Sequence, residues 1–410
     1  MLQRHQQIQP KIAWEAHIGS IQSRNNIISQ GAFIYIGTCG EKWNQADRGD
    51  GVYCLRAATG EIVWFSPTYS DVNEITLART DLIVPTDSGE IFILEKKSGA
   101  IKNVLRLDGP IFSKPLVRIS ERTWSAIIVS AHGKIYELDA GQNVAISLGD
   151  LGYPVRANLT YLDVAPFPIL LVLTETGYLM KCTLFNGKIK AETVRQIKYI
   201  GFNSRTRNLN IEDTDAYLHA VPARENNLIF GGYARDTYYD DAPLYCINVE
   251  TGEELWRAHH LAGINFGNCR TTPLIVGGEL VVSLSYADSV YFLNKYNGRV
   301  SGEILLGQTV FQQWSSPVAI GKSHAVVSRI DGVVSVIDIR HRKLVASVSL
   351  AAAEIERLKS TEPIGAFPLG PWEPPIGGIC GTPLVKGNRI FVGATSGRLV
   401  AIDVFARQST

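Results

Sequence analysis

One short pattern recurs along the whole chain, and its spacing limits the folds that this sequence can adopt. The segment GVYCLRAATGEIVW, Gly51–Trp64, returns as PLYCINVETGEELW, Pro243–Trp256. Weaker copies begin at Gly89, Gly133, Gly177, Asp288, Gly332 and Gly397. Eight copies of a unit of roughly 45 residues, each built from short apolar runs, indicate a radial or stacked repeat fold.

Each copy has the composition of a β-hairpin. An apolar run rich in Val, Ile, Leu and Tyr is followed by a polar turn with a nearly invariant glycine, and then by a second apolar run. A tight connection needs a positive φ at this point, which glycine adopts without steric cost. The turn glycines are Gly60, Gly99, Gly187, Gly252 and Gly298.

A proline precedes another apolar run upstream of several copies, as in FSKPLV, TTPLIV, SSPVAI and GTPLV. Proline cannot donate to a β-ladder, so it belongs at the start of an edge strand. An edge strand, a middle pair and a closing strand make four strands per repeat, which is one propeller blade. We therefore predict an all-β fold, a single eight-bladed β-propeller of four-stranded antiparallel blades.

The two ends of the chain predict how the ring closes. The last copy stops near Val404 without a closing strand, whereas the chain begins with KIAWEAH, Lys11–His17, which resembles a closing strand without a blade. We expect the N-terminal strand 11–17 to complete the blade of residues 380–404 and to remove two open edges. Residues 1–410 are then one propeller domain.

The repeats resemble the PQQ-like β-propeller repeat, in which a Thr-Gly turn is followed by a Trp that closes the blade. The resemblance extends from Lys11 to Val404, although most copies replace the Trp. Eight-bladed members of this family include the secreted quinoprotein dehydrogenases and the lipoprotein subunit of the outer-membrane barrel-assembly machinery. The resemblance implies the fold, but a fold does not determine function. The best matches are Thr59-Gly60 with Trp64, Thr251-Gly252 with Trp256, and Trp14.

The first and fifth copies are the most alike, and this similarity suggests a duplication of four blades. The repeat is also interrupted at three places. We predict insertions at residues 38–50, 201–242 and 351–378. Each is either a solvated loop or a partner-binding loop, and the proline-rich part of the third could instead cover the channel. Aromatic and basic side chains on these insertions are candidate partner-binding residues. They are Trp43, Arg48, Arg205, Arg207, Tyr217, Arg235, Tyr238, Tyr239, Phe367 and Trp372.

The first strand of each blade is expected to line a central channel, and several such segments carry basic or amide side chains. Basic groups that converge on one axis would attract anions. The alternative is that they pair with carboxylates of the neighbouring loops. The candidate channel-lining residues are Arg24, Lys114, Arg156, Arg270, Gln312 and Gln313.

The overall charge excludes some classes of partner. The net charge is +1, so there is no overall attraction to nucleic acid or to an anionic membrane. No apolar run is long enough to span a membrane. The first 17 residues lack the apolar core and cleavage site of a secretory signal, so we expect a cytoplasmic protein.

The sequence contains no recognisable catalytic or metal-binding motif. Cys54, Cys182 and Cys246 share one strand position and are predicted to be small core residues. In PQQ dehydrogenases, two adjacent cysteines cover the quinone, and a Glu, an Asn and an Asp hold calcium. This chain has no adjacent cysteines, and Glu74 is the plainest inner carboxylate. The GxSxG, HExxH and Walker-type patterns are also missing, so we expect no catalytic residue, cofactor or metal.

Two classes of function follow. The favoured hypothesis is a non-enzymatic scaffold or recognition subunit, which binds one or more protein partners in a larger cytoplasmic assembly through its loop face and insertions. The alternative is a sensor or binder of a small anionic ligand or acidic peptide in the channel. A PQQ-dependent oxidoreductase is a remote alternative.

Overall fold

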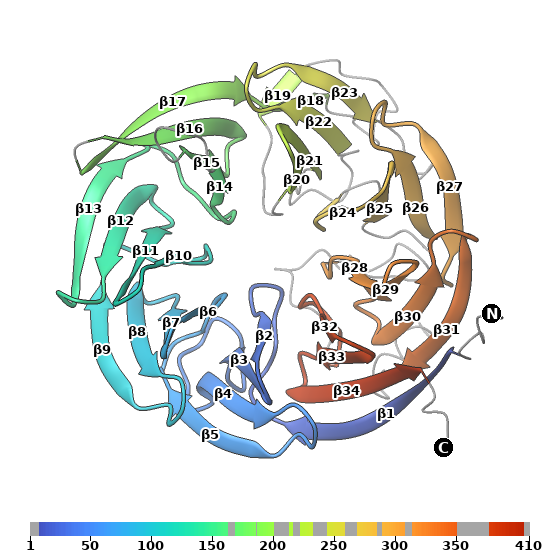
Figure 1. Ribbon diagram of the computed structural model, residues 1–410, viewed down its shortest axis with the longest axis horizontal. Helices are drawn as coiled ribbons and strands as arrows, with labels where there is room; N and C mark the ends of the chain where they lie inside the picture. The colour runs from blue at the N-terminus through green and yellow to red at the C-terminus, as the bar shows by residue number, and fades with distance from the viewer. Residues whose placement is uncertain are drawn as a thin grey trace.

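The structure, a computed structural model, describes residues 8–162, 169–185, 187–200, 213–215, 222–232, 244–258, 269–284, 289–307, 314–350 and 377–405. These residues form eight four-stranded antiparallel sheets, arranged as the blades of a ring around a central axis (Figure 1). The predicted eight-bladed β-propeller is therefore confirmed.

Blades 1 to 4 each run outward from the axis in chain order. Blade 1 consists of β2 (Ile27–Gln30), β3 (Phe33–Cys39), β4 (Asp50–Arg56) and β5 (Ile62–Pro67). Blade 2 consists of β6 (Thr76–Ala78), β7 (Asp81–Pro85), β8 (Glu90–Glu95) and β9 (Ile101–Arg106). Blade 3 consists of β10 (Leu116–Ile119), β11 (Trp124–Val129), β12 (Lys134–Asp139) and β13 (Val144–Asp150). Blade 4 consists of β14 (Thr160–Leu162), β15 (Ile169–Leu173), β16 (Tyr178–Phe185) and β17 (Lys188–Gln196).

Blades 5 to 7 repeat this order, after a separate pair formed by β18 (Lys198–Ile200) and β19 (Asp213–Asp215). Blade 5 consists of β20 (Ala223–Glu225), β21 (Leu228–Gly232), β22 (Leu244–Asn248) and β23 (Glu254–Ala258). Blade 6 consists of β24 (Leu274–Val276), β25 (Glu279–Ser283), β26 (Ser289–Asn294) and β27 (Val300–Leu305). Blade 7 consists of β28 (Val318–Ile320), β29 (His324–Ser328), β30 (Val333–Asp338) and β31 (Lys343–Ser349).

The N-terminal strand closes the ring, as predicted. Blade 8 consists of β32 (Leu384–Lys386), β33 (Arg389–Gly393), β34 (Arg398–Phe405) and, as its outer strand, β1 (Ile8–His17). β1 is antiparallel to β34, with Trp14 opposite Ala401 (Figure 1). Glu15 accepts two hydrogen bonds from Arg398, at 2.8 and 2.6 Å, and these bonds lower the pKa of the Glu15 carboxyl. The strand begins three residues earlier than the predicted residue 11.

The hydrophobic core is divided among the contacts between neighbouring blades. Between blades 1 and 2, for example, Val52 and Cys54 of β4 pack with Leu82 and Val84 of β7. The third strand of a blade has neighbours on both faces, so its sequence is almost continuously apolar and repeats most clearly. Cys54, Cys182 and Cys246 are buried free thiols in these cores, as predicted.

Two features of the insertions differ from the prediction. The range 201–242 contains β20 and β21, the first two strands of blade 5. These strands have three and five residues, which is too short to show a clear repeat. Within 38–50, residues 38, 39 and 50 belong to β3 and β4, so the inserted loop covers residues 40–49.

No helix in the described part of the chain is long and apolar enough to cross a membrane.

Candidate functional site

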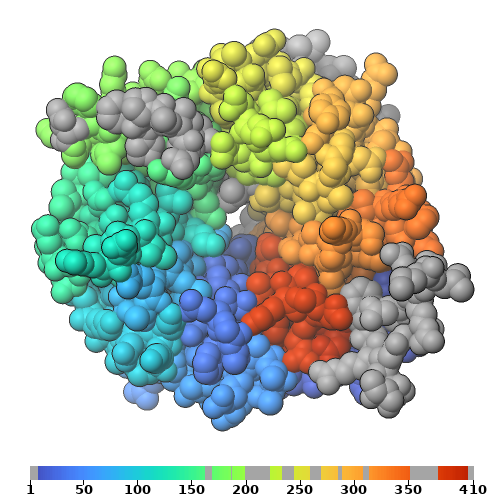
Figure 2. All heavy atoms as spheres, viewed as in Figure 1, coloured from blue at the N-terminus to red at the C-terminus, as the bar shows by residue number. Residues whose placement is uncertain are grey.

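A cavity of about 410 Å³ lies on the axis of the ring. Figure 2 shows the opening at the centre of the molecule. Its walls come from seven blades, because each contributes the residues directly before or within its innermost strand. The lining is mostly uncharged and includes one carboxyl and one amino side chain. It comprises Ser23, Asn25, Asn26, Ile27, Ile28, Glu74, Lys114, Asn158, Thr272, Pro273, Leu274, Ser316, Pro317, Thr382 and Pro383.

Side-chain hydrogen bonds tie the innermost segments to one another around this cavity. The backbone N–H of Lys114 donates to Asn158 Oδ1 at 2.6 Å. The N–H of Thr272 donates to Ser316 Oγ at 2.9 Å, and the N–H of Ser316 donates to Thr382 Oγ1 at 3.3 Å. Four of these residues directly precede the proline that leads into an inner strand, so the residue before the proline has a structural role in joining blades.

Glu74 and Lys114 give the cavity its two charges. Burial raises the pKa of Glu74, while a hydrogen bond from Asn158 and the nearby charge of Lys114 oppose the increase. Asn158 Nδ2 donates to Glu74 Oε1 at 2.8 Å. The acidic group therefore lies beside a basic one, and the cavity is polar without a strong excess of either charge.

A cluster of arginine and aromatic side chains lies where the segments leading into β2, β10 and β14 meet. The guanidinium carbons of Arg24 and Arg156 lie 4.5 and 4.7 Å from the ring centroid of Phe112. Arg24 also lies 5.9 Å from the ring centroid of Trp43, on the inserted loop. We call Arg24, Trp43, Phe112 and Arg156 the rim cluster. Because Arg24 and Phe112 belong to blades 1 and 3, their contact passes the inner end of blade 2.

Carboxylates of the neighbouring loops pair with both arginines of the rim cluster. Asp87 accepts hydrogen bonds from Arg24 at 3.1 and 3.0 Å, and Glu175 accepts one from Arg156 at 3.0 Å. This is the pairing that the sequence left open as an alternative to a cationic funnel. Both guanidiniums are held in place, so their charges are partly neutralised while their flat faces contact an aromatic ring.

The inserted loop of residues 40–49 is held to the body of the propeller by carboxylates. Asp47 accepts hydrogen bonds from the backbone N–H groups of Glu41, Lys42 and Gly49. Asp71 accepts one from the N–H of Asn44 at 2.7 Å. These bonds fix the conformation of the loop, so it is more than a solvated extension of the hairpin.

Two of the carboxyl groups under this loop form a buried pair. Asp50 and Asp71 are 0% and 2% exposed, and each accepts one hydrogen bond from a backbone N–H of this region, from Asp47 and from Asn44. The Oδ1 atom of each carboxyl is buried with no hydrogen-bond partner among the described residues. Burial raises the pKa of Asp50 to about 6 and that of Asp71 to about 7. The pair therefore titrates close to neutral pH.

The structure brings several of the predicted site residues together. Arg24, Arg156 and Trp43 meet in the rim cluster, and Lys114 lines the axial cavity. Arg48 is exposed on the inserted loop, and Arg270 lies 5.5 Å from the ring centroid of Trp314. The other predicted residues lie outside the described residues. They are Arg205, Arg207, Tyr217, Arg235, Tyr238, Tyr239, Gln312, Gln313, Phe367 and Trp372.

Sequence reasoning did not identify Phe112, Asp87 or Asn158 as site residues. Phe112 stands in the same FSKPLV segment that pointed to an edge strand, and Lys114 in that segment was recognised. A comparison of residues at equal distances before each inner strand could have found Phe112 and Asn158. No such pattern marks Asp87, which meets Arg24 across 63 residues of chain.

The comparisons with known proteins agree with this architecture. A family model described as outer membrane protein assembly factor BamB matches residues 218–409. No curated protein matches the chain. Together with the eight-bladed ring, this match over the second half of the chain confirms the resemblance to the PQQ-like propeller repeat.

Solved structures share the fold over nearly the whole chain. BamB from Moraxella catarrhalis is 14% identical with a TM-score of 0.63, covering 97% of this chain and 99% of that chain. The computationally designed protein Ika8 is 14% identical with a TM-score of 0.62, covering 96% and 99%. A europium-containing methanol dehydrogenase is 10% identical with a TM-score of 0.61, covering 96% and 93%. At these identities the similarity shows the fold alone.

The described part of the axial cavity does not fit a calcium–quinone centre. Its one carboxylate, Glu74, accepts a hydrogen bond from Asn158 and lies near the positive charge of Lys114, which disfavours a divalent cation there. Among the described residues, no group of three or more His, Cys, Asp and Glu side chains is placed to hold a metal ion.

Proposed function

We propose that this propeller is a non-enzymatic interaction scaffold that binds a protein partner, as one subunit of a larger assembly. The observation that carries the proposal is the rim cluster, which combines arginine, tryptophan and phenylalanine side chains from three blades. Trp and Arg are the residue types most enriched among side chains that dominate binding energy at protein interfaces. Binding residues also concentrate on loops that a rigid scaffold positions.

The inserted loop supports the same proposal because its conformation is already ordered. Asp47 and Asp71 hold its backbone, and Trp43 lies against Arg24. A partner that contacts this loop does not have to order it, which reduces the entropic cost of association. Arg48 is exposed on the same loop and would lie at the edge of the interface.

The family match supports a role with other proteins at a coarse level. An assembly factor is by its description a protein that works on others, and the matching model carries that description. We keep a cytoplasmic location and the absence of direct nucleic-acid and membrane binding as parts of the proposal. The expected absence of nucleic-acid and membrane binding depends on the net charge of +1. Fractionation of cells that express the full chain tests the location.

Affinity purification with matched variants tests the proposal. We expect Trp43→Ala to weaken retention of a specific protein by at least about tenfold, since truncation of a central interface residue costs 2 kcal/mol or more. Tyr296→Ala is the control, because Tyr296 is 70% exposed on an outer turn of blade 6. The retained protein is then identified, purified and titrated against both variants. Equal affinities for the two variants would contradict the assignment of the interface to the rim cluster.

A small ligand in the axial cavity is the second candidate function. The supporting observation is the cavity of about 410 Å³ with Lys114 in its wall, since this amino group could contact an anionic ligand or an acidic side chain. A screen of anionic metabolites, with PQQ plus calcium included, would show a rise in melting temperature that Lys114→Ala abolishes. No rise with any compound excludes this candidate and the remote PQQ-dependent oxidoreductase.

A further inference from the structure

At three contacts between blades, a tryptophan of the outer strand lies flat against the turn of the next blade. In each case a Cβ atom added to the turn glycine would stand 2.4 to 2.6 Å from the indole ring. The indole N–H of Trp14 donates to the carbonyl oxygen of Ala57 at 3.1 Å, and that of Trp256 to Lys295 at 2.9 Å. Each acceptor lies three residues before the glycine. The pairs are Trp14 with Gly60, Trp64 with Gly99, and Trp256 with Gly298.

Between blades 2 and 3, both partners of this contact are replaced. Asn103 of β9 stands four residues after Gly99, as Trp64 stands four residues after Gly60. Asn143 takes the place of the turn glycine and keeps its backbone conformation, with a φ of 53°. The Asn103 amide reaches the Asn143 carbonyl oxygen at 3.5 Å. Two short side chains therefore stand where an indole ring and a glycine meet elsewhere.

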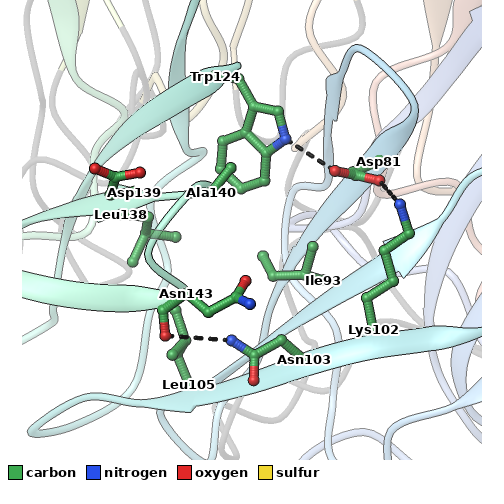
Figure 3. Close-up of a pocket in the computed structure, with 10 residues that line it drawn as sticks. All are labelled: Asp81, Ile93, Lys102, Asn103, Leu105, Trp124, Leu138, Asp139, Ala140 and Asn143. Carbon is green, nitrogen blue, oxygen red and sulfur yellow. Dashed lines mark hydrogen bonds and ion pairs between the residues drawn. The ribbon is translucent and has the colours of Figure 1, made fainter. Parts of the chain in front are cut away.

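A cavity of about 260 Å³ remains at this contact (Figure 3). Its apolar wall contains Ile93, Leu105, Leu138 and Ala140. Ala140 lies three residues before Asn143, the position whose carbonyl accepts the indole N–H at two other contacts. We call this cavity, bounded by these residues and by Asn103 and Asn143, the blade 2–3 socket.

The other side of the socket is polar and rigid. Trp124 Nε1 donates to Asp81 Oδ2 at 2.9 Å, and Lys102 Nζ pairs with Asp81 Oδ1 at 2.6 Å (Figure 3). These bonds hold the Trp124 ring at the border of the socket. An entering ring would meet apolar atoms on one side and an aromatic ring with a paired carboxylate on the other.

The contact between blades 6 and 7 shows that a missing tryptophan does not by itself leave a cavity. There the outer strand has Gly302, and Arg342 stands at the turn position. The guanidinium of Arg342 fills the space, since a Cβ atom on Gly302 would stand 2.5 Å from its Nη1. It also pairs with Glu279 and lies 5.5 Å from the Phe292 ring centroid. The socket has no such long side chain at either Asn103 or Asn143.

We propose that the blade 2–3 socket binds the indole ring of a tryptophan that a partner protein presents. The ring would take the position that Trp14, Trp64 and Trp256 occupy at their own contacts. The size is adequate, because an apolar cavity of about 150 Å³ already accommodates benzene. This proposal deepens the proposed function and rests on it, because it adds a second contact for the partner on the outer side of blades 2 and 3.

Titration of the full chain with N-acetyl-tryptophanamide, followed by NMR or calorimetry, tests the socket without any partner. We expect saturable binding at millimolar concentration, weaker binding of N-acetyl-leucinamide by at least fivefold, and loss of binding in Asn103→Trp, whose own ring fills the socket. Val104→Trp is the matched control, because Val104 is exposed on the next position of β9, and it should bind as the wild type does. Asn103→Phe provides a second filling variant if Asn103→Trp does not fold.

Three results would overturn the proposal. They are the absence of binding to the wild type, equal binding to wild type and both filling variants, and binding of free indole without binding of N-acetyl-tryptophanamide. The last result would mean that the socket accepts a free indole ring but not the indole ring of a tryptophan within a peptide. Since the assay contains no partner, any of these failures leaves the rim-cluster interface to be judged by its own experiment.

Discussion

At the scale of single residues, the effective charge of each ionisable group near the axis depends on the side chains around it. The sequence left open whether Arg24 and Arg156 make the channel cationic or pair with loop carboxylates, and the structure pairs them with Asp87 and Glu175. The buried pair Asp50 and Asp71 shows the opposite case, in which burial raises the pKa of two neighbouring acidic groups. Loop carboxylates thus decide the charge of this end of the ring, and the pair below the inserted loop makes part of it sensitive to pH.

The Asp71→Asn variant should reduce the pH dependence of stability. The pKa values of about 6 for Asp50 and about 7 for Asp71 lie above the ordinary value of 3.8, so between these limits the folded protein binds more protons than the unfolded chain. Their contribution to the free energy of unfolding is therefore fully present below pH 3.8 and is lost as pH rises through 6 to 7. An asparagine keeps an acceptor for the N–H of Asn44 but does not ionise.

Urea unfolding at pH 5 and pH 8 measures this effect as a difference between variant and wild type. The decrease in the free energy of unfolding from pH 5 to pH 8 should be smaller in Asp71→Asn. Glu41→Gln, at an exposed site on the same loop, is the control and should behave as the wild type does. An unchanged slope in Asp71→Asn would show that the pair does not titrate in this range.

At the scale of elements, the turn between the third and fourth strands of a blade reverses the chain and also contacts the neighbouring blade. Gly60 has a φ of 77°, as the hairpin pattern predicted. The structure adds that the Trp14 ring of the neighbouring blade lies directly on it. The Thr-Gly turn and the closing Trp, which the repeat pairs within one blade, therefore meet across blades. The recurring motif encodes the contact that joins consecutive blades.

Gly60→Ala should destabilise the protein more than Gly31→Ala. Both glycines have positive φ, at 77° and 57°, so both variants carry the cost of about 1–2 kcal/mol for a left-handed alanine. A Cβ atom at Gly60 also stands 2.5 Å from the Trp14 ring, whereas nothing lies within 4 Å of one at Gly31. Displacing the ring adds about 1–3 kcal/mol. Chemical unfolding of both variants measures the difference, and equal losses would contradict a close Trp14–Gly60 contact.

At the scale of the whole molecule, the ring depends on a strand from the opposite end of the chain. β1 covers β34, and Trp14 of β1 reaches blade 1, so a single strand joins the first and last blades. A propeller without this strand has an unpaired outer edge in blade 8 and no indole on Gly60. Closure thus removes an exposed edge and completes the last contact between blades.

Removal of residues 1–17 should increase the self-association of the protein. The edge of β34 then exposes unpaired backbone groups, which can pair with a second chain. Size-exclusion chromatography over a range of concentrations should show larger species than the full chain forms, and a peptide of residues 8–17 should reverse this change. Removal of residues 1–7, which precede β1, is the control. A monomeric 18–410 protein with an unchanged melting temperature would refute the dependence on β1.

The repeat alone was enough to predict the number of blades, their four strands, the turn glycines and the closing strand. These features depend on residues close together in sequence, whose alternation, glycines and prolines carry the physical preference for a strand or turn. The short strands β20 and β21 were missed because three to five residues hold too little pattern. The duplication of four blades stays a prediction.

The amino-acid sequence by itself determined the propeller, because neighbouring residues decide where strands and turns form. The pattern of each single copy is weak, but it becomes recognisable because it recurs along the chain. The tertiary structure alone decided the site. The pairing of Arg24 with Asp87, the burial of Asp50 beside Asp71, and the socket at Asn103 each require segments that meet only when blades pack around the axis. Charge neutralisation and cavity volume depend on those distances in space, which no spacing along the chain specifies.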